Sequence, residues 1–228
     1  MPAGELDDSR GSMFDITQTL HHFSIIALPF FLGITCHEVA HGYVSYLMGD
    51  PTAKLAGRLT LNPLKHLDPM GTLVLVLTQM IGWAKPVPIN PAYYKDYRRG
   101  IMFVSLAGPM ANFAVMIFFA ILLKIIIVAS QSPGSAEYAY ILRPMINIAA
   151  AGVFINAILG TFNLLPIPPL DGSKILACLL PGPMAARFMQ LERYGFIILL
   201  LLAFTGGLGM ILSPVSAFVQ NMIIKPLL

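Results

Sequence analysis

Four long apolar runs divide the chain and set its expected architecture. They lie at about residues 19–48, 101–129, 144–164 and 194–212. Each is long enough to cross roughly 30 Å of hydrocarbon at about 1.5 Å per helical residue. Of two shorter runs, 71–83 predicts a re-entrant or hairpin segment, although a short crossing helix also fits, and 215–224 is ambiguous. The pattern predicts an all-α polytopic membrane protein with a bundle of about four to six transmembrane helices.

Two polar stretches between the first two long runs have a different pattern. Residues 52–62 and 83–90 combine β-branched residues, prolines and turn residues. Such segments are typical of short strands, so we expect a small β element on the cytosolic side of the bundle. An edge strand there could pair with an extended peptide.

Composition agrees with a membrane protein. The chain is 57% hydrophobic and 11% charged, with a mean hydropathy of +0.75, which lies outside the range of ordinary soluble domains. Residues 1–12 are polar and are interpreted as a disordered tail or a cloning remnant, with no removable signal peptide. Residues 13–228 are then expected to form a single integral-membrane domain.

The basic residues predict the orientation of the bundle. They gather after the first long run, before the second and between the third and fourth, whereas residues 130–143 carry only Glu137 and Arg143 as charged groups. The basic loops are therefore expected in the cytosol. This places both ends of 71–83 on one face and favours the re-entrant alternative. No basic run is interleaved with aromatic residues, so we expect the lipid bilayer as a partner and no nucleic acid.

A metal-binding pattern lies inside the first apolar run. Residues 37–41 read His-Glu-Val-Ala-His. Side chains four apart share one helix face, so His37 and His41 can bind a single ion while Glu38 points beside them towards water. Zinc acidifies water and polarises a carbonyl, and a neighbouring Glu can take the proton. The alternative, two core histidines bonded to backbone, is disfavoured because ionisable groups at membrane depth are costly.

A catalytic zinc needs a third protein ligand, and one acidic residue stands out. Asp171 follows the proline-rich stretch 163–170, where the third long run breaks down. Irregular backbone at membrane depth is tolerated only where it lines a cavity or is buried in protein. The alternative role for Asp171 is the N-cap of a helix over 172–180, and both roles could coexist.

Together these residues resemble the site-2 protease family of intramembrane zinc metalloproteases. The resemblance rests on the His-Glu-x-x-His motif, on Asn163 through Leu170-Asp171-Gly172, and on supporting stretches in the expected order. These stretches are Gly49–Ala53, Gly57–Pro63, Lys85–Asn90 and Gly108–Asn112. It implies one zinc per chain, held by His37, His41 and Asp171, with Glu38 activating the attacking water.

The resemblance also suggests residues for substrate binding. Asn163 matches a family asparagine that holds the substrate or stabilises an oxyanion, with polar contact between helices as the equal alternative. Gly108, Pro109 and Asn112 match a motif near the substrate path, for which close helix packing is the alternative.

The implied activity is cleavage of a transmembrane segment of another protein, as in regulated intramembrane proteolysis. We expect a substrate already shortened by an earlier cut, in the plasma (inner) membrane of a prokaryote. We expect a minimal family member, without an inserted peptide-binding PDZ module or a regulatory domain. A homo-oligomer or a regulatory membrane partner stays open.

Two other functions remain open at this stage. One is a zinc transporter or zinc-binding scaffold without hydrolytic activity, which has no need of Glu38 as a base. The other is a membrane protease of a different family with a Glu as third ligand, for which Glu137 and Glu192 are poorly placed.

Overall fold

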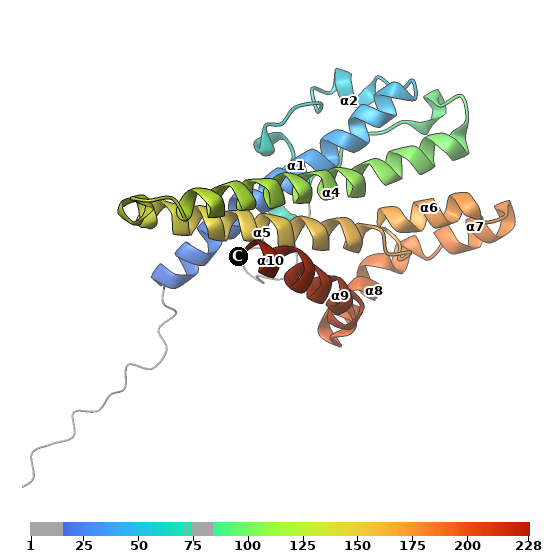
Figure 1. Cartoon of the computed structure of the whole chain (residues 1–228). Coiled ribbons are helices and arrows are strands. Elements are labelled where there is room, and N and C mark those ends of the chain that lie inside the picture. The colour runs from blue at the N-terminus through green and yellow to red at the C-terminus, as the bar shows by residue number, and fades with distance from the viewer. Residues whose placement is uncertain (1–15, 72, 74–83) are drawn as a thin grey trace, which may run out of the picture.

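The computed structural model describes residues 16–71, 73 and 84–228, and these are largely helical (Figure 1). The α-helices are α1 (Ile16–Leu47), α2 (Thr52–Leu55), α4 (Tyr97–Ser130), α5 (Ala139–Asn163), α6 (Asp171–Leu179), α7 (Gly182–Met189), α8 (Glu192–Phe204), α9 (Gly207–Phe218) and α10 (Lys225–Leu227). Short 3₁₀ turns occur at Pro63–Lys65 (η1), Pro91–Tyr93 (η2) and Ser135–Tyr138 (η3), and Val219–Ile224 (η4) is a π-helix. The all-α class is confirmed.

The centre of the molecule is a bundle of the three long helices α1, α4 and α5 (Figure 1). Apolar side chains of α4 and α5 form its core, with Phe119, Leu123 and Val153 almost fully buried. A Cβ atom at Gly152 would lie 2.3 Å from the Phe119 ring, so only glycine lets the two helices approach this closely. Close backbone approach at small residues is how helices pack in lipid.

Four helical stretches in the described part of the chain are long and apolar enough to cross a membrane. They are Phe23–Leu47, Tyr97–Ser130, Ser135–Asn163 and Gly207–Leu227. The first three agree with the predicted runs. The prediction of a fourth span over 194–212 was wrong, because α8 ends at Phe204 and Gly206 adopts a left-handed φ of 76°. The chain turns there, and the residues after Gly206 join 215–224 in a different span.

The predicted β element is also wrong. Within the described residues, Leu67 and Ala84 form an isolated antiparallel bridge, and residues 52–55 are helical. In residues 84–90 the prolines at 86 and 88 have no N–H, and the N–H groups of 85, 87 and 90 already bond within the chain. Five of the seven residues in this segment therefore offer no free N–H to a strand ladder. Residues 72 and 74–83 lie outside the described part of the chain, so the re-entrant assignment stays a prediction.

A buried carboxylate joins the loop after α1 to the segment before α4. Asp50 is fully buried and accepts hydrogen bonds from the Ser45 hydroxyl (2.9 Å), the Asn90 N–H (2.7 Å) and the Thr52 N–H (2.9 Å). Burial alone would raise the pKa of Asp50, but these hydrogen bonds outweigh it and hold that pKa below its ordinary value. Asp50 thereby anchors residues 84–90 against the end of α1.

The two ends of the bundle differ as the charge pattern predicts. The end of α1, the start of α4 and the helices α6 and α7 lie at one end in Figure 1, and the turn between α4 and α5 lies at the other. The segments rich in lysine and arginine therefore share one end, which the positive-inside rule assigns to the cytosol.

Candidate metal centre

Helix α1 brings two imidazoles together near its C-terminal end. His37 and His41 lie one helical turn apart, are both buried, and place their Nε2 atoms 2.9 Å from each other. The rings meet edge to face with centroids 4.5 Å apart. The four-residue spacing thus produces the shared face that the sequence predicts.

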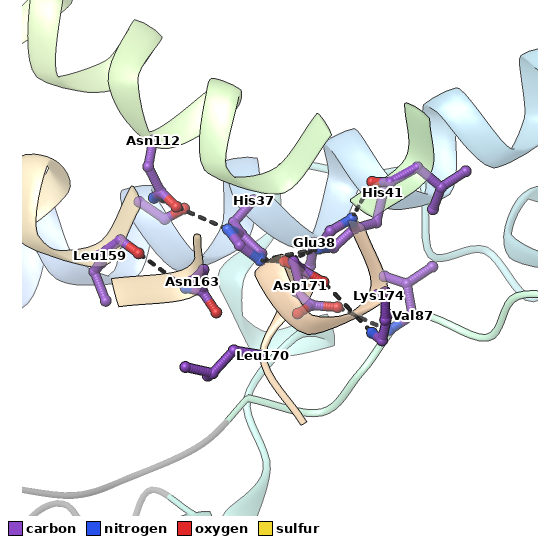
Figure 2. Close-up of polar contacts among 12 residues, drawn as sticks. His37, Glu38, His41, Val87, Asn112, Leu159, Asn163, Leu170, Asp171 and Lys174 are labelled. Carbon is purple, nitrogen blue, oxygen red and sulfur yellow. Dashed lines mark hydrogen bonds and ion pairs between the residues drawn. The ribbon is translucent and has the colours of Figure 1, made fainter. Parts of the chain in front are cut away.

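Asp171, the first residue of α6, meets the two histidines. Its Oδ2 atom lies 3.2 Å from Nε2 of His37 and 3.1 Å from Nε2 of His41 (Figure 2). Gly172 makes this approach possible, because a Cβ atom there would lie 2.1 Å from the carbonyl oxygen of Leu164. Leu170 occupies the N-cap position of α6, so the carboxylate faces the histidines instead of capping the helix. The sequence-distant residues His37, His41 and Asp171 form one cluster.

The Nδ1 atoms of both histidines face partners on α4. His41 Nδ1 lies 2.7 Å from the carbonyl oxygen of Val104, which can only accept, so this nitrogen carries the proton. His37 Nδ1 lies 2.7 Å from Oδ1 of Asn112. Contacts of this kind orient metal-binding histidines and leave Nε2 free as the ligand atom.

The cluster fits a zinc ion. Tetrahedral ligands at about 2.0–2.2 Å from zinc lie roughly 3.3 Å from each other, close to the three spacings observed here. A Cβ atom at Gly108 would lie 2.5 Å from His41 Nε2 and 2.6 Å from His37 Nε2, so the missing side chain leaves room beside the nitrogens. Two imidazoles and one carboxylate are also a donor set that catalytic zinc accepts, with a fourth position left for substrate or water.

The charge of Asp171 suits a ligand. Burial disfavours its ionised form, but the adjacent imidazoles and the ammonium group of Lys174 outweigh that effect and hold the pKa of Asp171 below its ordinary value. Lys174 Nζ lies 3.4 Å from Oδ1 of Asp171, while Oδ2 faces the histidines. The carboxylate therefore meets the candidate metal position and the lysine with different oxygens.

Glu38 lies beside the cluster, and its carboxylate is held by the segment that precedes α4. Its Oε2 atom accepts the backbone N–H of Val87 at 2.8 Å. Val87 belongs to residues 84–90, the segment that Asp50 anchors through Asn90. A loop distant in sequence thus orients the carboxylate that follows His37.

A cavity of about 380 Å³ opens onto the cluster. His37, Glu38, His41 and Asp171 contribute to its wall. Other lining residues are Pro86, Val87, Ile89, Pro91, Ile101, Val104, Ser105, Asn163, Pro169, Leu170 and Lys174. The cavity is thus bounded by the 86–91 segment, α1, α4, the end of α5 and the start of α6.

The residues predicted to bind substrate fall into two groups. Asn163 lines the cavity and donates from Nδ2 to the Leu159 carbonyl in its own helix (Figure 2). Gly108 and Pro109 are buried in α4, and Asn112 bonds to Nδ1 of His37. None of the three is among the residues that line the cavity, although Gly108 lies against the Nε2 atoms of both histidines. Their substrate-binding role stays a prediction.

Sequence reasoning missed three residues that contact the cluster or Glu38, namely Val87, Val104 and Lys174, and it also missed Asn156, which bonds to Asn112 behind His37. Val87 and Val104 act through main-chain atoms, which leave no signal in side-chain type. Lys174 could have been found, because it lies one helical turn after Asp171.

Comparison with known proteins decides the family. The sequence profile of peptidase family M50 matches residues 25–203. The chain belongs to peptidase family M50. This family uses zinc, so the protein is a zinc metalloprotease, and its apolar helices make it a membrane protein. The M50 assignment confirms the resemblance drawn from the sequence motifs.

Curated M50-like relatives span most of the chain. The Bacillus subtilis protein named "Putative zinc metalloprotease YwhC" is 39% identical over 88% of this chain and 89% of its own length. The Mycolicibacterium smegmatis protein named "Putative zinc metalloprotease Rip2" is 30% identical over 82% of this chain and 69% of its own length. No solved structure matches the chain.

Proposed function

We propose that this M50 protein is an intramembrane endopeptidase that cleaves a transmembrane segment of a substrate protein. In this proposal His37, His41 and Asp171 hold one zinc ion and Glu38 is the general base. The observation that carries it is the place of Glu38, which lines the cavity beside three converging ligand atoms. A transporter or scaffold has no need of a carboxylate in that position.

The depth of the cluster supports cleavage within the membrane. His37 and His41 lie inside the apolar stretch Phe23–Leu47, and His41 is roughly 9 Å along the helix from its cytosolic end. The cavity lies at the end of the bundle that carries the polar loops. Water can therefore enter from the cytosol, while a membrane-spanning substrate can approach from the bilayer.

The groups in the cavity divide the work of peptide hydrolysis. Zinc, when bound, acidifies water and polarises a peptide carbonyl. Because Oε2 of Glu38 is occupied by the Val87 N–H, its Oε1 atom is the one that can take a proton from water and pass it to the leaving nitrogen. One N–H of the Asn163 amide is used by Leu159, which leaves the second to donate to an oxyanion.

The substrate has to present extended backbone at this point, because a regular helix shields its own carbonyl groups. Helix-breaking residues near the middle of the substrate span would favour this. We propose a substrate shortened by an earlier cut, since the cavity is small and is enclosed by four helices and the 86–91 segment. The plasma membrane of a prokaryote is the proposed location, in keeping with the bacterial relatives.

The test uses purified protein in liposomes with a quenched-fluorescent transmembrane peptide that carries Gly and Pro at its centre. We expect zinc-dependent cleavage by the wild type, and a loss of about a thousandfold in Glu38→Gln with the zinc content unchanged. Cleavage by Glu38→Gln at the wild-type rate would refute the proposed base. Equal uptake of zinc into liposomes by both proteins, without cleavage by either, would favour a transporter.

A further inference from the structure

Two buried asparagines connect helix α5 to His37 through the interior of the bundle. Asn112 on α4 and Asn156 on α5 have 1% and 0% of their surface exposed, and neither lines the cavity. Figure 2 shows the Asn112 side chain directed at His37, with Asp171 on the other side of the imidazole ring. An amide is costly to bury unless its hydrogen bonds are made, so the direction of each bond in this pair matters.

Main-chain carbonyls set the orientation of the Asn156 amide. Its Nδ2 atom lies 3.0 Å from the Gly152 oxygen and 3.4 Å from the Pro29 oxygen. Carbonyl oxygens only accept, so the group that faces them must be the NH₂ group. The Oδ1 atom of Asn156 therefore faces Asn112, whichever way the amide would otherwise be assigned.

The same reasoning then fixes Asn112. Its Nδ2 atom lies 3.1 Å from the Gly33 oxygen and 3.3 Å from Oδ1 of Asn156, and both of these atoms accept. The reversed amide would place oxygen against oxygen at both contacts. Oδ1 of Asn112 must then face His37 Nδ1 at 2.7 Å, and an amide oxygen can only accept.

The consequence for His37 is a defined tautomer. Its Nδ1 carries a proton, which leaves Nε2 as the nitrogen that faces Asp171 and His41 and can bind a metal. We propose that Asn156, acting through Asn112, is a positioning residue that holds His37 in this tautomer and ring orientation. The proposal rests on the assignment of His37 as a metal ligand under the proposed function, although the tautomer itself can be observed without metal.

A glycine in α1 makes room for the two asparagine side chains. Gly33 lies one helical turn before His37, and a Cβ atom there would come within 2.3 Å of Oδ1 of Asn156 and 3.4 Å of Nδ2 of Asn112. The glycine is thus required where the asparagine pair meets α1. The alternative is that the pair only binds helices together, a role that polar side chains often have in membranes.

The first experiment observes the tautomer in zinc-free protein. Protein labelled with ¹⁵N-histidine is purified in detergent above pH 8, and its ring nitrogens are recorded by long-range ¹H–¹⁵N correlation, with His37 assigned by the loss of its signals in His37→Ala. We expect Nδ1 of His37 to be protonated throughout in the wild type and only partly in Asn156→Leu, because the Asn112 amide then keeps the Gly33 oxygen alone to fix its orientation. Full protonation of His37 Nδ1 in Asn156→Leu would overturn the proposal, whether or not the protein cleaves peptides.

The second experiment measures zinc affinity by competition with a chelator. Loss of an outer-shell partner weakens metal binding by about 10–100-fold, so we expect that range for Asn112→Leu and about tenfold for Asn156→Leu. Asn156→Ala removes the same amide without added bulk, and it replaces the leucine variant if that protein does not fold. Val153→Ala is the matched control, because it opens the same helix pair at a buried site outside the asparagine pair.

We expect Val153→Ala to lower the midpoint of thermal unfolding and to keep the wild-type zinc affinity. If Asn156→Ala keeps wild-type affinity within about twofold, Asn156 only binds helices together and the proposal is wrong. The same conclusion follows if Val153→Ala weakens zinc binding as much as the asparagine variants do.

Discussion

The side of the metal centre that faces the bundle differs from the side that faces the cavity. On the bundle side, the Nδ1 atoms of both histidines meet buried partners on α4, and one of these partners is held in turn by α5. On the cavity side, Glu38 is oriented by one backbone N–H, and the partly exposed Lys174 forms one ion pair. The geometry of the candidate ligands is therefore set by buried hydrogen bonds between helices. The groups that line the cavity are held by single contacts at its wall, which can rearrange without disturbing the bundle.

The largest effect should come from removing the ligand that joins the two sides. We expect about one tightly bound zinc per chain in the wild type, and Asp171→Ala should lose it or bind it more than a hundredfold more weakly. Zinc per chain in detergent-purified protein is the measurement, and Asp96→Ala, which removes an exposed carboxylate, is the control. Unchanged zinc in Asp171→Ala would remove this residue from the centre.

A methyl group at Gly108 should displace both histidine rings from the candidate metal position. The added Cβ would occupy the space beside both Nε2 atoms, so zinc affinity should fall at least tenfold, as judged by chelator competition. The added atom would lie closer to the rings than real Cβ contacts allow, so the buried rings must shift and the midpoint of thermal unfolding should also fall. Gly209→Ala adds the same methyl group where nothing lies within 4 Å, and it should bind zinc normally. Equal affinities in both variants would contradict the Gly108 assignment.

Proline at position 87 should affect the cavity side alone. Val87→Pro removes the N–H that orients Glu38, so the rate of peptide cleavage should fall about tenfold while zinc content stays at the wild-type level. Val87→Ala keeps the N–H and is the matched control. A parallel loss of zinc in the proline variant would show that the two sides are not separable.

Acid should destabilise the attachment of residues 84–90 to the end of α1, because it protonates Asp50. Because the pKa of Asp50 is lower in the folded protein than its ordinary value of 3.8, its stabilising effect is complete above that value and is lost as the pH falls through the folded pKa. We expect the thermal midpoint of zinc-free wild type to approach that of Asp50→Asn below about pH 4. Asp96→Asn, which keeps an N-cap oxygen for α4, should follow the wild type. A constant difference between wild type and Asp50→Asn from pH 6 to pH 3 would contradict this role.

The helical class and three of the spans could be predicted, because long apolar runs have few other stable states in a membrane. The fourth span was misplaced, since the signal that ends this helix, Gly206 between Thr205 and Gly207 with a left-handed backbone conformation, lies inside an otherwise apolar run. The predicted β element was wrong because two prolines remove backbone N–H donors, and hydrogen bonds to Glu38 and Asp50 use two others that a strand would need. Nothing in the sequence marked Asn156 as a residue that acts on the site, since an isolated asparagine in an apolar helix usually forms a hydrogen bond between helices.

The sequence by itself determined which residues can hold a metal and where the apolar spans lie, because helical spacing and hydrophobicity are local properties. His37, Glu38 and His41 could be assigned within one turn of helix. Only the tertiary structure decided that α6 places Asp171 against the two histidines and that Val87 binds Glu38. It also decided that Asn156 contacts His37 indirectly, through Asn112. Those contacts join segments far apart in the chain, and their directions depend on main-chain carbonyls that become neighbours only when the helices pack.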